Sequence, residues 1–260
     1  MAVQLSTSLS QVEGVEVIVL DGSVNTGESV LGLSDIDLKV FFSNKEGDAV
    51  FSGARQILVE AQAEHNFPIN AWFLPMTDHP SRSASTFDFV RSFVLKCGST
   101  LFGAELSGDI LLHERTTDKD RWATERAMLD FSVRLRRLAT NPTSISDIDS
   151  VNGLVVLKQA IAYSVHGLRY FRAAHGEVLC RISDCCNFDD CSFDATMLTP
   201  LYDDVVEARE HWPDVKCKDF ESASAFLQKS IRALDWMRQN LPQEDEISLK
   251  YTNQDGSVLG

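Results

Sequence analysis

Two aspartates, Asp35 and Asp37, stand at the start of an otherwise hydrophobic stretch in the segment SDIDLKVFF. In a strand, residues i and i+2 project from the same face with Cα atoms about 6.6 Å apart, so we expect the two carboxylates side by side. Such carboxylates repel each other unless a cation lies between them. Mg²⁺ suits this pair, because it takes one or two carboxylates and fills its remaining positions with phosphate oxygens and water. The pattern predicts a magnesium site of the kind used in phosphoryl transfer.

A Gly-Ser pair, Gly22 and Ser23, precedes this segment and directly follows Asp21 at the end of an apolar run. A glycine lets the backbone approach a ligand closely, and a serine hydroxyl with neighbouring N–H groups can hold a phosphate. We expect Gly27 and Gly32 to keep the connecting loop tight. The two segments together predict a phosphate-binding turn on one strand end beside a metal site on the next strand.

The spacing of these residues resembles a family signature. The apolar run, Gly22-Ser23, a ten-residue spacer and Ser34-Asp35-Ile36-Asp37-Leu38 are similar to the motif of the polymerase-β-like nucleotidyltransferase superfamily, particularly its bacterial aminoglycoside and minimal nucleotidyltransferases. The segment VLKCGSTLFGAEL, residues 94–106, is similar to a helix and turn that follow the catalytic sheet in those enzymes. The likeness covers most of the chain, although only residues 18–42 are specific.

This resemblance implies a Mg²⁺-dependent enzyme that moves a nucleoside monophosphate from ATP or another NTP to a hydroxyl acceptor. It implies that Asp35 and Asp37 are the catalytic metal ligands and that Gly22 and Ser23 bind the nucleotide. A small cationic hydroxyl substrate of the aminoglycoside type is the favoured acceptor, because the chain has a long helical extension. A protein acceptor, as in the minimal nucleotidyltransferases, is the alternative.

The chain departs from the family pattern at a third position. Catalytic members usually add a third carboxylate from the strand after the intervening helix, and the matching position in PINAWFL is Asn70. An amide offers one neutral oxygen to a metal but cannot accept a proton. Asp78, just past this strand, can substitute only if its loop folds back. A non-catalytic relative that binds nucleotide is therefore the alternative function.

The elements that must position these residues fall into two parts, which make an α+β fold. Residues 1–115 predict a nucleotidyltransferase domain, a mixed β-sheet with helices. Its expected elements are strands at Val15–Leu20, Ile36–Phe42 and Pro68–Leu74 and helices at about 49–64 and 86–98. Residues 116–260 predict an α-helical bundle that binds the acceptor or a partner, with helices near 120–140, 150–176, 199–212 and 221–241.

Charge and hydropathy narrow the choice of partners. The 260 residues include 24 Lys and Arg against 38 Asp and Glu, a formal net charge of −14. An acidic surface suits a cationic substrate and disfavours nucleic acid, whose phosphates need a basic patch. No apolar stretch approaches the roughly 20 residues that span a bilayer, and no export signal is evident, so we predict a cytoplasmic protein with reduced thiols and no membrane contact. A homodimer is left open.

Three further features have both a chemical and a structural interpretation. The cysteines of residues 180–191 follow a C-x4-C-C-x4-C spacing, which does not match the C-x2-C pairs of zinc sites and favours packing by small thiols. Arg169 and His175 have the R-x5-H spacing that resembles the RNase motif of the HEPN family, although a local role in a basic region is favoured. Glu125 lies in a helix of alternating charge, typical of a solvated face, and is a secondary candidate for a general base.

Overall fold

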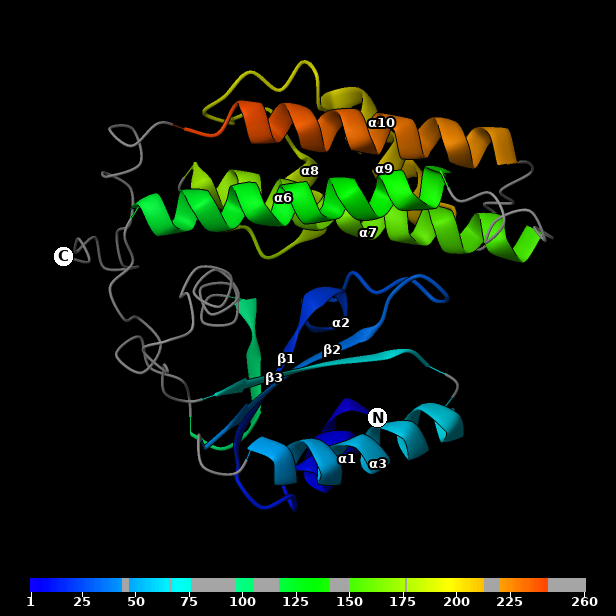
Figure 1. Cartoon of the computed structure of the whole chain (residues 1–260). Coiled ribbons are helices and arrows are strands. Elements are labelled where there is room, and N and C mark those ends of the chain that lie inside the picture. Colours follow the sequence, from blue (N-terminus) through cyan, green and yellow to red (C-terminus); the bar gives the residue numbers. More distant parts are fainter. Residues whose placement is uncertain are drawn as a thin grey trace. The chain divides into compact units, whose positions relative to one another are not determined.

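The computed structural model describes residues 1–43, 47–65, 67–75, 97–104, 117–140, 150–175, 177–212 and 220–242. The chain divides into two compact units, Met1–Arg115 and Thr116–Gly260. The first unit contains a four-stranded mixed sheet with helices and the second is helical, so the fold is α+β (Figure 1). Among the described residues, none of the helices combines the length and the apolar character that a membrane span requires.

The sheet is built from β1 (Val15–Asp21), β2 (Ile36–Phe42), β3 (Ile69–Pro75) and β4 (Ser99–Phe102), in the order β3-β2-β1-β4. Strand β1 pairs antiparallel with β2 and β4, whereas β2 and β3 are parallel. Parallel strands need a crossover connection, and helix α3 (Gly47–His65) supplies it between β2 and β3. Strands β1 and β2 are rich in Val, Ile and Phe, residues that favour extended backbone.

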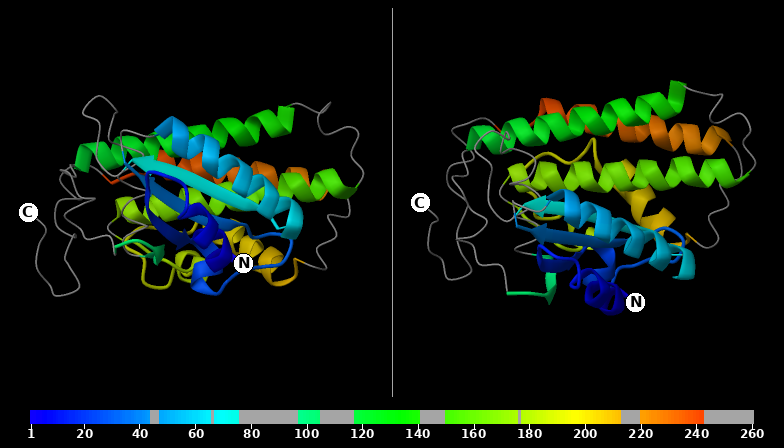
Figure 2. Two further views of the ribbon diagram at one scale, coloured as in Figure 1. Left: turned by 90° about the horizontal axis from the view of Figure 1, so that it is seen from below. Right: turned by 60° about the horizontal axis from the view of Figure 1, so that its bottom comes forward.

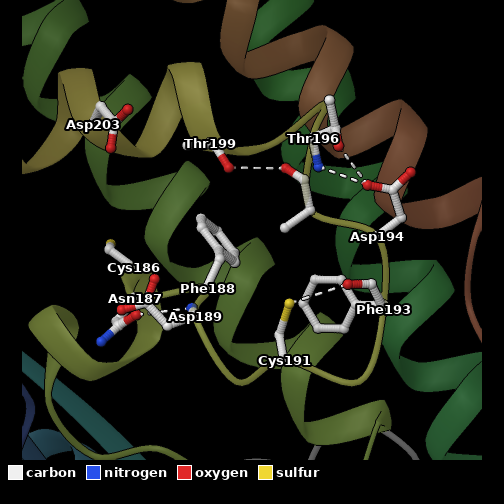
Figure 3. Close-up of a pocket in the computed structure, with 11 residues that line it drawn as sticks. Cys186, Asn187, Phe188, Asp189, Cys191, Phe193, Asp194, Thr196, Thr199 and Asp203 are labelled. Atoms are coloured by element: carbon white, nitrogen blue, oxygen red, sulfur yellow. Dashed lines mark hydrogen bonds between the residues drawn. The ribbon is translucent and has the colours of Figure 1, made fainter.

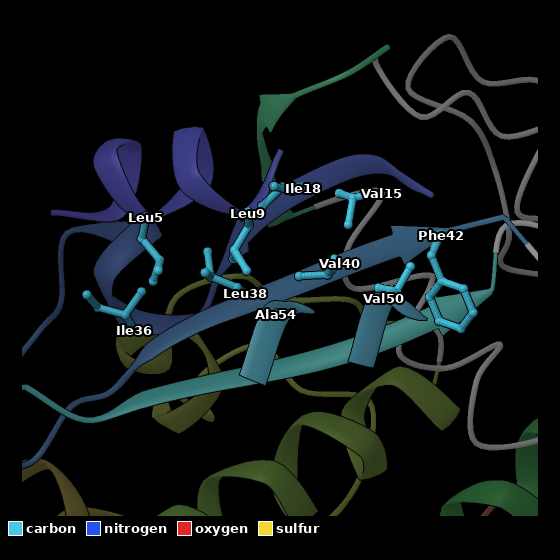
Figure 4. Packing of buried hydrophobic residues seen from close by; sticks show 10 residues of the cluster. All are labelled: Leu5, Leu9, Val15, Ile18, Ile36, Leu38, Val40, Phe42, Val50 and Ala54. Carbon is cyan, nitrogen blue, oxygen red and sulfur yellow. The ribbon is translucent and has the colours of Figure 1, made fainter. Parts of the chain in front are cut away.

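One face of the sheet is sealed by α3 and by α1 (Ala2–Leu9), which lie on the same side of it (Figure 1). Figure 4 shows the resulting core, to which α1, α3, β1 and β2 all contribute. In β2 the alternate residues Ile36, Leu38, Val40 and Phe42 all belong to this core. Because successive side chains of a strand point to opposite faces, Asp37 and Lys39 project from the other face.

The second unit is organised around three long helices that lie alongside one another, α6 (Thr117–Thr140), α7 (Ser150–Ala174) and α10 (Phe220–Gln239) (Figure 2). Helix α6 runs antiparallel to α7 and α10 (Figure 1). The chain returns between α7 and α10 through α8 (Ile182–Cys186) and α9 (Thr199–Glu210). Helices α7 and α10 pack closely, because a side chain at Gly167 would clash with Leu234.

A buried arginine holds this return segment. The Nε atom of Arg172 donates a hydrogen bond to Oε2 of Glu177 at 2.7 Å. Its Nη1 atom lies 3.4, 2.8 and 2.6 Å from the carbonyl oxygens of Asp184, Cys185 and Asn187. The guanidinium thus satisfies buried and part-buried backbone acceptors around α8, as the burial of polar backbone requires.

The predicted strands and helices agree with the structure in most of the described residues. Strand β2 has the predicted bounds, and β1 and β3 each end one residue later than expected. Three short elements lie outside the prediction: α1, α8 and α2 (Gly22–Thr26), the last of which replaces the expected turn with a short helix.

The sequence-based expectation for residues 99–102 is wrong. Within residues 94–106, where a helix and turn were predicted, Ser99–Phe102 form strand β4. This segment is extended because its backbone pairs with β1, which would otherwise be an unpaired edge of the sheet. The helix predicted at 86–98 falls almost entirely outside the described residues.

Candidate functional site

The register of the sheet brings three polar residues into one row. Asp21 and Asp37 are Cα partners in the antiparallel β1–β2 pair, and Asp37 and Asn70 are partners in the parallel β2–β3 pair. The row therefore crosses three adjacent strands at the end of the sheet where β1 finishes and β2 and β3 begin. The predicted catalytic position Asp37 lies in its centre, with the predicted third position Asn70 next to it.

Gly22 lies directly against Asp37. Its φ angle is +73°, a left-handed conformation that favours glycine, and it is buried at the start of α2. A Cβ atom built at Gly22 would clash with Oδ2 of Asp37 and would lie 3.2 Å from its Cγ. The glycine therefore permits the carboxylate to lie against the backbone of α2, and both steric space and backbone angle require it.

Ser23 fixes the connection that leads to Asp35. Its hydroxyl donates a hydrogen bond to Oγ of Ser34 at 2.9 Å, and the same Ser34 oxygen accepts one from the N–H of Val30 at 2.9 Å. Asp35 follows immediately and is half-buried just before β2 begins. The residue directly before Asp35 is thus tied to α2 by a side-chain hydrogen bond.

Asn70 is hydrogen-bonded to Asp37. Its Nδ2 atom donates to Oδ1 of Asp37 at 2.8 Å, so the amide occupies the place where a third carboxylate was expected and contacts the central one. Asp78, the predicted substitute, lies outside the described residues. The third position is therefore an amide, which can orient Asp37 but cannot take a proton from an acceptor.

Burial is the main influence on the ionisation of Asp37. It raises the pKa of this carboxyl, and the nearby charges of Asp21 and Asp35 raise the pKa further. The charge of Lys39 and the hydrogen bond from Asn70 oppose this, but the pKa remains above its ordinary value. A carboxylate that is held away from water among other acids gains much from a bound cation.

Three further residues lie on this face of the sheet: Asp21, Lys39 and Trp72. The sequence analysis did not predict any of them as part of the site. The Nζ atom of Lys39 lies 3.7 Å from Oδ2 of Asp21, and the two side chains are only 8% and 16% exposed. The same Nζ lies 4.9 Å from the ring centroid of Trp72, which is 41% exposed. The sequence could have indicated Lys39, because Asp35, Asp37 and Lys39 are alternate residues of one strand segment and therefore project from the same face.

The donor set fits a magnesium ion that is bound together with a nucleotide. Within the part of the chain that the structure describes, no three His, Cys, Asp or Glu side chains gather into a metal-binding group. Asp35 and Asp37 would therefore supply the protein ligands, and phosphate oxygens and water the rest, which is the usual coordination of Mg²⁺. A metal held by protein ligands alone does not fit this arrangement.

The other residues considered in the sequence analysis, Arg169, His175 and Glu125, lie in the helical unit. Arg169 donates to the carbonyl oxygen of Cys180, and the ring of His175 lies 4.6 Å from Phe171 and 4.9 Å from Phe193, so this pair contributes to packing of the helical unit. Glu125 is exposed on α6.

The cysteines are of two kinds. Cys185, Cys186 and Cys191 are thiols, as predicted. Cys180 is part of a disulfide, so the prediction of reduced thiols is wrong at this position. Near α8, the thiol of Cys185 is buried, which fits the predicted packing role.

Comparison of the chain with protein-family models and with curated proteins finds no match. The case for a function therefore depends on the residues and geometry described above.

Proposed function

We propose that the protein is a Mg²⁺-dependent nucleotidyltransferase that moves a nucleoside monophosphate from ATP or another NTP to a hydroxyl acceptor. The observation that supports it best is the close contact of Gly22 with Asp37 at the junction of β1, α2 and β2. A half-buried carboxylate against a glycine backbone, with Asp35 two residues before it, offers a metal ligand beside space for a phosphate.

In this reaction the acceptor oxygen forms a bond to the α-phosphorus of the NTP, and the bond from that phosphorus to the bridging oxygen of pyrophosphate breaks. Asp35 and Asp37 would hold the metal, which would supply positive charge against the phosphates, and Gly22 and Ser23 would position the nucleotide. Catalysis of this kind depends mainly on positioning and on stabilisation of developing charge. The hydroxyl proton needs an acceptor other than Asn70, because an amide is not a base at neutral pH.

The test is the transfer activity of Asp37→Asn, which keeps the shape of the side chain and removes its charge. We expect Mg²⁺-dependent release of pyrophosphate from NTP to be lost, while circular dichroism shows an unchanged fold. Glu16→Gln is the matched control, since Glu16 is exposed on the adjacent strand β1, and it should retain activity. Equal turnover by wild type and Asp37→Asn would rule out the proposed site.

For the acceptor we propose a small cationic hydroxyl compound of the aminoglycoside type, because the chain has a net charge of −14. A protein acceptor is the alternative. Protein incubated with labelled ATP and Mg²⁺ should label compounds of an aminoglycoside panel. Label that appears only on a polypeptide when cell lysate is added would defeat the small-molecule version and support the protein acceptor.

A second candidate function is nucleotide binding without chemistry, and the hydrogen bond from Asn70 to Asp37 is the observation that favours it. The informative variant is Asn70→Asp, which restores a third carboxylate on the row. If wild type binds ATP with Mg²⁺ in calorimetry without turnover and only Asn70→Asp releases pyrophosphate, the protein is a binding module. Turnover by the wild type excludes this second candidate.

A further inference from the structure

The helical unit contains a pocket of about 570 Å³ formed by the loop after α8 and the beginning of α9 (Figure 3). This volume lies within the range of about 300–1,000 Å³ that is usual for small-ligand sites. All of its lining residues fall between Cys186 and Asp203, so the pocket belongs to one unit and to one continuous stretch of chain.

Two phenylalanines give the pocket an aromatic lining. Phe188 and Phe193 are half-buried, and Figure 3 shows both rings among the lining side chains. The ring of Phe193 packs edge-on at 4.8 Å from Phe171, and that of Phe188 at 5.8 Å from the buried Tyr202. Each ring is therefore held in place on one side and open to the pocket on the other.

The polar lining is acidic and is not neutralised. Asp189, Asp194 and Asp203 line the pocket, and no Lys or Arg does so. Asp194 accepts hydrogen bonds from the N–H and hydroxyl of Thr196, at 3.0 and 2.6 Å. Among the described residues, the exposed carboxylates of Asp189 and Asp203 have neither a hydrogen bond nor an ion pair.

Arg172, which lies close to the Phe188 ring, cannot serve as the counterion. Arg172 lies 5.8 Å from the Phe188 ring, but it is buried and occupied by Glu177 and by backbone carbonyls. The pocket therefore combines unneutralised negative charge with half-buried aromatic rings. A cation attracted to such a site gains from the ring faces as well as from the carboxylates.

We propose that this pocket binds an aliphatic polyamine, whose ammonium groups contact Asp189 and Asp203 and whose methylene groups pack against Phe188 and Phe193. An organic cation fits better than a metal ion, because no metal-binding group of three acidic, His or Cys side chains is present among the described residues. The inference does not depend on nucleotidyl transfer, and its tests use no nucleotide.

The first test is calorimetric titration of the full-length protein with spermidine. We expect saturable binding, and Asp189→Asn combined with Asp203→Asn should weaken it about tenfold, the effect of losing two exposed charge contacts. The matched control is Asp184→Asn combined with Asp190→Asn, which removes the same charge from exposed residues that do not line the pocket. Binding that is absent, or that both double variants weaken equally, would overturn the proposal in favour of general attraction to an acidic protein.

A second test locates the ligand in the wild-type protein and needs no variant. Cys186 and Cys191 line the pocket, whereas Cys185 is buried. Spermidine at saturation should slow the alkylation of Cys186 and Cys191 by iodoacetamide, measured residue by residue by mass spectrometry. A neutral diol of similar length should give no protection. Unchanged alkylation rates at both cysteines under saturating spermidine would place the ligand elsewhere and overturn the proposal.

Discussion

Lys39 in the sheet unit and Arg172 in the helical unit are both buried cations, 7% and 6% exposed, but their surroundings differ. Arg172 is enclosed by hydrogen bonds to Glu177 and to three backbone carbonyls. The Nζ atom of Lys39 lies 3.7 Å from Oδ2 of Asp21, which is beyond hydrogen-bond distance, and close to the ring of Trp72, and its charge also acts on Asp37.

The difference separates a charge that holds the fold together from one that belongs to the proposed binding site. The donors of Arg172 are used by the protein itself, so removing it takes a hydrogen-bond donor away from Glu177 and from three backbone carbonyls. Lys39 faces three aspartates, Asp21, Asp35 and Asp37, and one positive charge cannot neutralise them all. The sheet face therefore keeps an excess of negative charge, as a site for a cation-bound ligand should.

Of the substitutions considered, Arg172→Met should cause the largest loss of folding stability. Removing one member of a buried, hydrogen-bonded ion pair costs about 3–5 kcal/mol, and here three carbonyls also lose their donor. Urea denaturation should show this loss of stability. The control Arg181→Met, at an exposed position nearby, should change stability by no more than about 0.5 kcal/mol. Similar stability of the two variants would contradict the structural role of Arg172.

Gly22→Ala should have the next largest effect. The new methyl group would clash with Asp37. The alanine would also have to adopt the positive φ angle of Gly22, and such backbone strain costs about 1–3 kcal/mol. Gly27→Ala is a matched control, because Gly27 has a φ angle of +76° and nothing within 4 Å of a built Cβ. Thermal melts should therefore show a smaller loss for Gly27→Ala, and only Gly22→Ala should impair binding of Mg²⁺ with ATP. Equal behaviour of the two variants would show that the contact with Asp37 has no consequence.

Lys39→Met should cost less stability than Arg172→Met, because the Nζ atom of Lys39 lies beyond hydrogen-bond distance of Asp21, whereas Arg172 donates hydrogen bonds at 2.6–2.8 Å. Adding Asp21→Asn should recover any loss, since it removes the carboxylate that is left unpaired. By contrast, Glu177→Gln should not recover the loss caused by Arg172→Met, because the carbonyls stay unsatisfied. Denaturation curves of the single and double variants measure both recoveries. Recovery by Glu177→Gln, without recovery by Asp21→Asn, would contradict the comparison of the two cations.

The smallest effect concerns the pH dependence of Asp37. Burial raises the pKa of this carboxyl in the folded protein, so the folded state prefers its neutral form. Ionisation therefore lowers stability as the pH rises from the ordinary pKa of 3.8 through the raised value. In chelator, Asp37→Asn should melt above the wild type at neutral pH, and the difference should vanish below that ordinary pKa. A difference in melting temperature that is constant with pH would contradict the raised pKa.

The sequence predicts the local parts of this structure well because they depend on local patterns. Strand β2 has its exact bounds, since its alternate residues from Ile36 to Phe42 are apolar and its other face contains Asp37 and Lys39. Strand β4 escapes prediction because Ser99–Phe102 is short, mostly exposed and extended only through pairing with a strand about 80 residues earlier. Such long-range pairing leaves little trace in composition.

The same limit applies to the site and to the pocket. The neighbours Asp37 and Asn70 are separated by a helix, and only the parallel register puts their side chains in contact. The ion pair of Lys39 with Asp21 likewise depends on how β1 and β2 align. The acidic pocket arises from the course of the chain between Cys186 and Asp203, where no periodic pattern exists to indicate which side chains converge.

The contact between Gly22 and Asp37 also restricts how the sequence can diverge. While the carboxylate of Asp37 is retained, every side chain larger than hydrogen at position 22 is excluded by the same atom that is proposed to serve the reaction. If a descendant lost the reaction and replaced Asp37 with a smaller residue, that steric barrier would disappear, and only the backbone angle would select for glycine. Lineages that lose the chemistry should therefore substitute at position 37 first and at position 22 afterwards, so the order of replacements in a family tree would record when the activity ended.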